Sequence, residues 1–98
     1  MEVEFKDPDY DRLETDATFT AGFPNEIVKL YRRRIWFIRN AADERDFYAM
    51  KSLHFEKLKG DRVGQHSMRL NSQWRLILEL KKRNDGKTVV IISIADYH

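Results

Sequence analysis

The sequence predicts an α+β fold in which two to three helices from the N-terminal half pack on a mostly antiparallel sheet of four to five strands. Two observations support this prediction. Apolar residues recur at helical intervals in the first half of the chain, and the period changes to two residues from about Ser52 onward. The strand-like segments of the second half are separated by short turns, which favours antiparallel neighbours. A chain of 98 residues is long enough for one domain, 1–98.

The helical signals follow a first short strand at 2–5, which alternates polar and apolar residues. Segment 9–16 is long enough for one or two helical turns. A longer helix begins at Pro24, because proline suits the first turn of a helix. A break near Asn40 separates this helix from a shorter one within 41–50. The apolar residues of the longer helix fall on one face, and they are Ile27, Leu30, Tyr31, Ile35 and Ile38.

Strands and turns alternate in the second half of the chain. The last strand is apolar enough to lie centrally in the sheet, and Asn84, Asp85 and Gly86 in the hairpin before it tolerate positive φ. This order describes a helical layer packed on an antiparallel sheet. The predicted strands are 53–58, 65–70, 74–80 and 88–97, and they are joined by a loop at 59–64, a turn at 71–73 and a hairpin at 81–87.

The composition excludes several classes of protein. The chain has no cysteine, so disulfides and thiolate zinc sites are ruled out and a reducing cytoplasm fits. The acidic N-terminal segment lacks the apolar core of a signal peptide, and the longest apolar run, 89–95, is too short to span a bilayer. Phosphate-binding glycine loops and serine-hydrolase motifs do not occur. We therefore expect a cytoplasmic protein with no membrane contact and no cofactor.

The net charge of +2 hides an asymmetry between two parts of the chain. Residues 1–26 carry eight acids and two bases, which gives −6, while residues 27–98 carry sixteen bases and eight acids, which gives +8. A positive field of this kind favours a polyanion such as nucleic acid, although a solvated ionic surface would have the same composition. The charge alone leaves both interpretations open.

Strand alternation decides which of the basic side chains can meet. Arg69 lies on the polar face of strand 65–70, and Arg75 lies on the polar face of strand 74–80. If the apolar faces pack on the helices, both arginines project onto the open side of the sheet. Solvated arginines are also common on exposed strands. His66 shares its face with apolar residues, which favours a structural histidine over a catalytic one.

An open sheet face with cations, an imidazole and a phenol is suited to RNA, since phosphates bind Arg and Lys and unstacked bases lie on aromatic rings. Cleavage also needs a base for the ribose 2′-hydroxyl, an acid for the departing 5′-oxygen and cations for the charged phosphorane. The candidates for proton transfer are Asp96, Tyr97 and His98, and the candidate electrophiles are Arg75, Arg69 and Lys59. Such a reaction requires no metal, and the three histidines lack the spacing of metal ligands.

Segment 58–80 reads LKGDRVGQHSMRLNSQWRLILEL, and the chain stops on DYH. The combination of LKGDR, NSQWR and DYH at these spacings resembles the HigB branch of the RelE/ParE superfamily of toxin–antitoxin systems, the plasmid maintenance killer-like toxins. The likeness covers nearly the whole chain, including the FTAGFP segment before the longer helix. The resemblance implies a small RelE-like fold.

The resemblance also implies a ribosome-dependent mRNA endonuclease that acts in the ribosomal A site by attack of the 2′-hydroxyl, without metal. The implied partners are the ribosome, a HigA-like helix-turn-helix antitoxin, and operator DNA reached only through the toxin–antitoxin complex. Asp96, Tyr97 and His98 match the catalytic end of the family, and Lys59 and Arg75 match its phosphate-contacting positions. The residues expected to bind RNA beside them are Arg69, Arg62, Lys57 and His54.

One position departs from the pattern of the family. Relatives with a second catalytic histidine carry it where this chain has Glu56. His54, expected on the same face of strand 53–58, either replaces that group in part or plays no role. Three functions therefore stay open: the endonuclease, a ParE-like inhibitor of DNA gyrase, and a ribosome- or RNA-binding protein with weak or no catalysis. Arg32 and Arg33 are expected to contact the antitoxin or ribosomal RNA.

Overall fold

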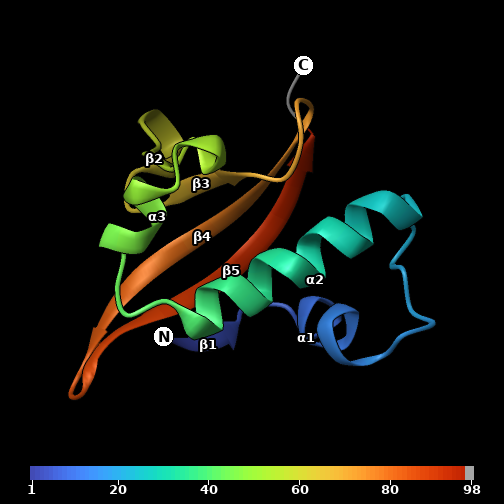
Figure 1. Cartoon of the computed structure of the whole chain (residues 1–98), viewed down its shortest axis with the longest axis horizontal. Coiled ribbons are helices and arrows are strands. Elements are labelled where there is room, and N and C mark those ends of the chain that lie inside the picture. The colour runs from blue at the N-terminus through green and yellow to red at the C-terminus, as the bar shows by residue number, and fades with distance from the viewer. Residues whose placement is uncertain (97–98) are drawn as a thin grey trace.

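The computed structural model describes residues 1–96, which contain one sheet of five strands. The strands are β1 (Glu2–Phe5), β2 (Glu56–Lys57), β3 (His66–Arg69), β4 (Trp74–Arg83) and β5 (Gly86–Asp96). Their order across the sheet is β1-β5-β4-β3-β2. β1 runs parallel to β5, and the other neighbours are antiparallel. The long strands β4 and β5 therefore lie inside the sheet (Figure 1).

Three helices and two 3-10 turns complete the described chain. They are α1 (Pro8–Thr15), α2 (Asn25–Asn40), α3 (Arg45–Ala49), η1 (Lys51–Leu53) and η2 (Gly60–Arg62). Asp7 begins α1, because its side chain accepts a hydrogen bond from the N–H of Asp9 at 2.9 Å, and Pro24 precedes α2. Figure 1 shows α2 crossing one face of the sheet. The predicted α+β fold is confirmed.

The core lies between α2 and the sheet. The predicted helix face is buried there: Ile27, Tyr31, Ile35 and Ile38 are fully buried, and Leu30 packs against the core while partly exposed. Burial of apolar surface is the main favourable term in folding, and truncating one such side chain to Ala typically costs about 2–5 kcal/mol. The sheet contributes Met68, Leu76, Leu78, Val89 and Ile91 to the same core.

The predicted strand 53–58 is wrong over most of its length. η1 ends at Leu53, His54 adopts the left-handed conformation with φ 47°, and only the two residues of β2 pair with β3. Leu53 and Phe55 are both buried, so they imitate the alternation of a strand although a turn places them there. Consequently His54 and Glu56 do not share a strand face.

A β-bulge interrupts the pairing of β4 with β5. Leu78 is opposite Ile91. The preceding residue of β4, Ile77, is opposite Ser93, which leaves Ile92 as an extra residue in β5. Because side chains alternate along a strand, one extra residue reverses the faces of all residues that follow it.

The reversal sets the faces at the end of β5. Ile94 enters the core, and Asp96, two residues farther on, shares its face. The partner of Asp96 in the register is Trp74, which packs against the core. Ala95 pairs instead with Arg75, on the opposite face of the sheet.

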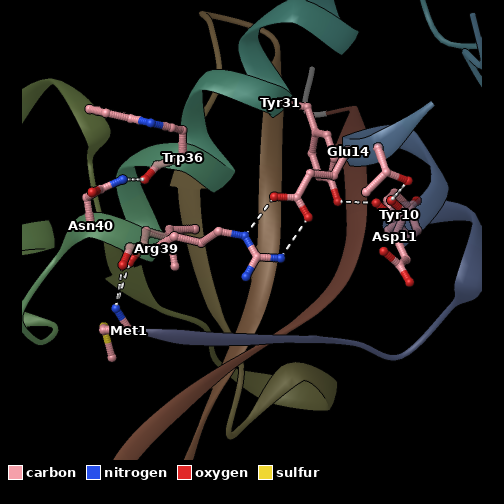
Figure 2. Close-up of polar contacts among 10 residues, drawn as sticks. Met1, Tyr10, Asp11, Glu14, Tyr31, Trp36, Arg39 and Asn40 are labelled. Atoms are coloured by element: carbon pink, nitrogen blue, oxygen red, sulfur yellow. Dashed lines mark hydrogen bonds and ion pairs between the residues drawn. The ribbon is translucent and has the colours of Figure 1, made fainter. Parts of the chain in front are cut away.

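Tyr10 holds β5 beyond the end of β1. β1 accompanies β5 only as far as Ile91, whose carbonyl accepts the N–H of Lys6 at 3.0 Å. Farther along, the N–H of Ile94 donates to the hydroxyl of Tyr10 at 3.1 Å. The hydroxyl of Tyr31 donates to the carbonyl of Tyr10 at 2.7 Å (Figure 2), and burial raises the pKa of Tyr31, so this phenol stays protonated. α1 and α2 thus fix the end of β5.

Candidate functional site

Arg69 and Arg75 lie directly opposite each other, at the end of β3 and near the start of β4. Cross-strand partners point to the same face of a sheet. Their chain neighbours Met68 and Leu76 enter the core, so the two arginines project from the face turned away from α2. The side chain of Arg75 is only 17% exposed, so most of this cation is packed against neighbouring residues.

Both arginines converge on His54, from the turn between η1 and β2. Arg75 donates from Nη2 to the carbonyl oxygen of His54 at 2.8 Å, and Arg69 Nη1 lies 3.2 Å from the imidazole Nε2. A guanidinium can only donate, so Nε2 of His54 accepts and its lone pair is engaged in this bond. The left-handed backbone of His54 is what turns its carbonyl and its ring toward the two strands.

Glu56 lies beside the arginine pair, with its Oε1 3.6 Å from Arg75 Nη2. The Glu56 side chain is 59% exposed, so the contact is worth little energetically. Arg69 is held from a second side, since its Nε donates to the carbonyl of Asn71 at 3.1 Å. The two guanidinium groups are therefore oriented before any ligand arrives.

The other predicted cations lie on β2 and on the loop between β2 and β3. The loop closes through the N–H of Leu58, which donates to the carbonyl of Gln65 at 2.9 Å. Arg62 donates from Nη1 to the side-chain oxygen of Gln65 at 3.2 Å, which favours a role in holding the loop. Lys57 and Lys59 are exposed. Lys57 at the end of β2 and Lys59 on the loop are thus exposed, while the arginine of the loop is held in place.

Asp96 meets the turn between β3 and β4. Gln73 donates from Nε2 to Oδ1 of Asp96 at 3.0 Å. Asn71 shapes this turn, because its Oδ1 accepts the N–H groups of Gln73 and Trp74 at 2.9 and 2.8 Å. Sequence reasoning missed Asn71 and Gln73, although an Asn at the start of a short turn is a recognisable signal for this geometry.

The structure does not place all predicted site residues together. It joins Arg69, Arg75 and His54, and it leaves Asp96 at the same end of the sheet but on the opposite face. The other two residues of the predicted catalytic end, Tyr97 and His98, lie outside the described residues.

The sequence predicted that the sheet face with the arginines would be open, but part of this face is buried. Ser67 and Ile77 lie opposite each other on this face, and both are fully buried. Ile77 is also separate from the main core cluster. This part of the face is therefore closed to solvent.

His66 stands apart from the arginine pair. Its ring stacks on Phe55 with the centroids 5.0 Å apart and the planes 6° from parallel. Burial lowers the pKa of His66, and the nearby charge of Lys57 acts in the same direction, so the neutral imidazole is favoured. Its contacts are those of a structural histidine.

Within residues 1–96, no group of three or more His, Cys, Asp or Glu side chains has the arrangement of a metal site. The same part of the chain contains no helix that is long and apolar enough to cross a bilayer. The chemistry available in the described site is that of two oriented guanidinium groups, which can bind a phosphate and stabilise charge that develops on it.

Comparison with solved structures finds proteins that share this fold. A YoeB/ParE toxin from Agrobacterium tumefaciens matches with a TM-score of 0.62 and 19% identity over 100% of both chains. The YoeB–YefM complex from Staphylococcus aureus matches with a TM-score of 0.58 and 20% identity, over 100% of this chain and 97% of that one. The toxin–antitoxin complex RelBE2 from Mycobacterium tuberculosis matches with a TM-score of 0.51 and 18% identity, over 99% of this chain and 96% of that one. At these identities the likeness shows the fold.

The family follows from a sequence comparison. The family model of the HigB-like toxins, described as RelE-like toxins of type II toxin–antitoxin systems, matches residues 3–98. This chain belongs to that family, whose members are translation-inhibiting endonucleases. The resemblance noted in the sequence is therefore confirmed. No match was found among curated protein sequences.

Proposed function

We propose that this toxin is a ribosome-dependent endonuclease that cleaves translated mRNA in the A site by attack of the ribose 2′-hydroxyl. The observation that carries the proposal is the pair Arg69 and Arg75, directly opposite on adjacent strands and both held by His54. Two guanidinium groups fixed in this way match a phosphate that gains negative charge during the reaction. The family supplies the reaction class.

The proposed reaction needs no group outside the protein and the RNA. The 2′-oxygen forms a bond to phosphorus as a base takes its proton, and the bond from phosphorus to the 5′-oxygen breaks as an acid protonates that oxygen. Arg75 and Arg69 stabilise the phosphorane between these steps. We assign the proton transfers to the terminal Tyr97 and His98. Asp96 of the same predicted end lies on the other face of the sheet from the arginines, so we assign it a positioning role, in which Gln73 holds it.

RNA binding is proposed for the cations around the arginine pair. Lys59 is exposed on the loop between β2 and β3, and Lys57 is exposed at the end of β2, from where they can contact phosphates on either side of the cleaved bond. Arg62 supports them by holding the loop. His54 contributes chiefly by orienting the arginines, because its Nε2 lone pair is already engaged.

The proposed partners follow from the same function. Two of the structural neighbours are complexes of a toxin with an antitoxin, which supports an antitoxin partner for this chain. We propose that it is a HigA-like helix-turn-helix protein and that operator DNA is bound only by the complex. The ribosome places the reaction in the cytoplasm.

The test is to map the 5′ ends of cellular messages within minutes of inducing the wild-type chain from a tight promoter. Cuts inside translated frames are expected for wild type and for the control variant Lys82→Ala, an exposed cation far along β4. They should disappear in Arg75→Ala and in the double variant Tyr97→Phe/His98→Ala, provided that circular dichroism shows a folded chain.

Growth arrest without such cuts would overturn the proposal and would favour inhibition of DNA gyrase or binding to the ribosome without catalysis. Cuts that persist in the double variant would leave the nuclease in place but remove the terminal residues from its chemistry.

A further inference from the structure

Trp36 is an unusual residue for the outer face of a helix, because 68% of its surface is exposed. The other tryptophan of the chain, Trp74, packs against the core. In Figure 2 the indole of Trp36 projects from α2 away from the polar cluster formed by Arg39, Glu14 and Tyr31. Exposed tryptophans on rigid helices are typical anchors of protein interfaces.

A groove between α2 and α3 begins next to Trp36. It has a volume of about 570 Å³. Asn40 connects the two features, because its side chain lines the groove and donates to the carbonyl of Trp36 at 2.8 Å (Figure 2). The residues that line the groove are Phe37, Asn40, Ala41, Asp46, Ala49 and Met50.

The lining of the groove is mostly apolar. Met50 is 42% exposed and Tyr48, on the same short helix α3, is 50% exposed. The acid in the lining, Asp46, is directed at the backbone, where its carboxylate accepts the N–H of Ala42 at 2.8 Å. Thioether, methyl and phenyl groups of this kind suit the apolar side chains of a protein partner better than the phosphates of RNA.

Exposed cations lie on α2 and shortly after α3, the two helices that border the groove. Lys29, Arg33 and Trp36 follow one another at intervals of four and three residues, so they form one stripe along α2. Lys51 comes directly after Met50 at the other side of the groove. Lys29, Arg33 and Lys51 are exposed, and none of them forms an ion pair within residues 1–96.

Arg32 does not belong to this stripe, although the sequence suggested it together with Arg33. Its guanidinium donates to the carbonyl of Leu13 at 2.8 Å and to the carbonyl of Asp16 at 2.9 Å. Arg32 therefore ties α2 to α1, while Arg33 points its charge outward. The helix separates a structural arginine from one that is available to a partner.

We propose that this surface, formed by Lys29, Arg33, Trp36 and the groove between α2 and α3, binds an acidic segment of the antitoxin that inserts an apolar side chain beside Trp36. The proposal rests on the family of the chain, since a type II toxin acts with an antitoxin. Charge complementarity selects the occupant: an acidic protein segment matches both the cations and the apolar lining. A symmetric contact with a second copy would bring the same cations against each other.

The experiment uses the full chain with 5-fluorotryptophan and the purified antitoxin encoded in the same operon. The fluorine signal of Trp36, assigned with Trp36→Phe, should shift on binding, while the signal of the packed Trp74 serves as an internal reference. Calorimetry should show that Trp36→Ala weakens binding by about 30-fold, as expected for an interface anchor worth about 2 kcal/mol. Arg33→Glu should weaken it by about tenfold, and the matched control Lys82→Glu should not.

Unchanged affinity in Trp36→Ala and Arg33→Glu, with an unshifted Trp36 signal, would overturn the proposal. A shift that appears with ribosomes but not with antitoxin would assign the surface to RNA instead, and a shift that depends only on the concentration of the chain would assign it to a second copy. Binding is measured without any cleavage assay, so loss of the nuclease proposal would leave this result standing.

Discussion

Two cationic regions of this toxin differ in how their charge is held. Arg69 and Arg75 are fixed by hydrogen bonds to His54 and Asn71, and Arg75 is largely buried. Arg33, on the outer face of α2, extends into solvent. A reacting phosphate benefits from cations whose orientation is set in advance, since no reorganisation is then needed. A docking surface tolerates mobile charges, which mainly steer the partner and raise its association rate.

The largest expected effect comes from breaking the oriented pair. Arg75→Ala should lower the rate of message cleavage by about 10²–10³-fold, because it removes a fixed donor from the developing phosphorane. Cleavage of a ribosome-bound message in vitro measures this. Arg33→Ala is the matched control and should cleave as wild type does. Equal losses in both variants would erase the distinction between the two regions.

Tyr10 tests whether the end of β5 must be rigid. Tyr10→Phe removes the acceptor for the N–H of Ile94 and should lower the free energy of unfolding by about 1–3 kcal/mol. Urea denaturation gives this value, and hydrogen exchange at Ile94 should accelerate. Tyr48→Phe, which alters a half-exposed phenol, should change stability by less than about 0.5 kcal/mol. A Tyr10→Phe variant as stable as wild type would show that β5 holds its own end.

Gln73 fixes Asp96 at the same end of the sheet as the arginine pair, on the other face. Gln73→Ala should lower kcat by about tenfold with little change in KM, because Asp96 loses the donor that positions it. Gln73→Glu should be worse, since it puts a second carboxylate beside the first. Steady-state kinetics on ribosome-bound message separates the two constants. A loss confined to KM would make Gln73 an RNA contact.

His66 gives the smallest effect, and one that depends on pH. Burial lowers its pKa in the folded state, so between that value and the ordinary one of about 6.5 the unfolded chain binds more protons. Stability should therefore fall as pH drops through about 6.5 and level off below the folded pKa. His66→Phe, which keeps the stacking on Phe55, should show a shallower decline in urea denaturation at pH 7.5 and 5.5. Identical slopes would mean that His66 does not contribute.

Much of the fold could be predicted from local patterns. The spacing of Ile27, Tyr31, Ile35 and Ile38 identified α2 and its buried face, because a long amphipathic helix repeats its signal over several turns. Turn residues located the hairpin before β5 in the same way. Both features depend on residues that are close in the sequence.

The parts that could not be predicted depend on contacts between distant segments. Leu53 and Phe55 alternate as a strand would, yet the left-handed His54 between them is supported by arginines fifteen and twenty-one residues away. Gln73 looked like an ordinary turn residue, because its partner Asp96 lies on the last strand. Strand alternation predicted that Arg69 and Arg75 share a face, but it did not predict that both would form hydrogen bonds to His54.

The extra residue in β5 has a consequence for how this fold can vary. Because of the bulge at Ile92, Ile91 and Ile94 both face the core although they are three residues apart, whereas in a regular strand residues on one face are separated by an even number of positions. Deleting one residue there would move every later side chain to the other face of the sheet, so that Asp96 would share the face of the arginines and Ile94 would leave the core. Insertions or deletions near this point therefore preserve the faces of the later residues only when they involve an even number of residues.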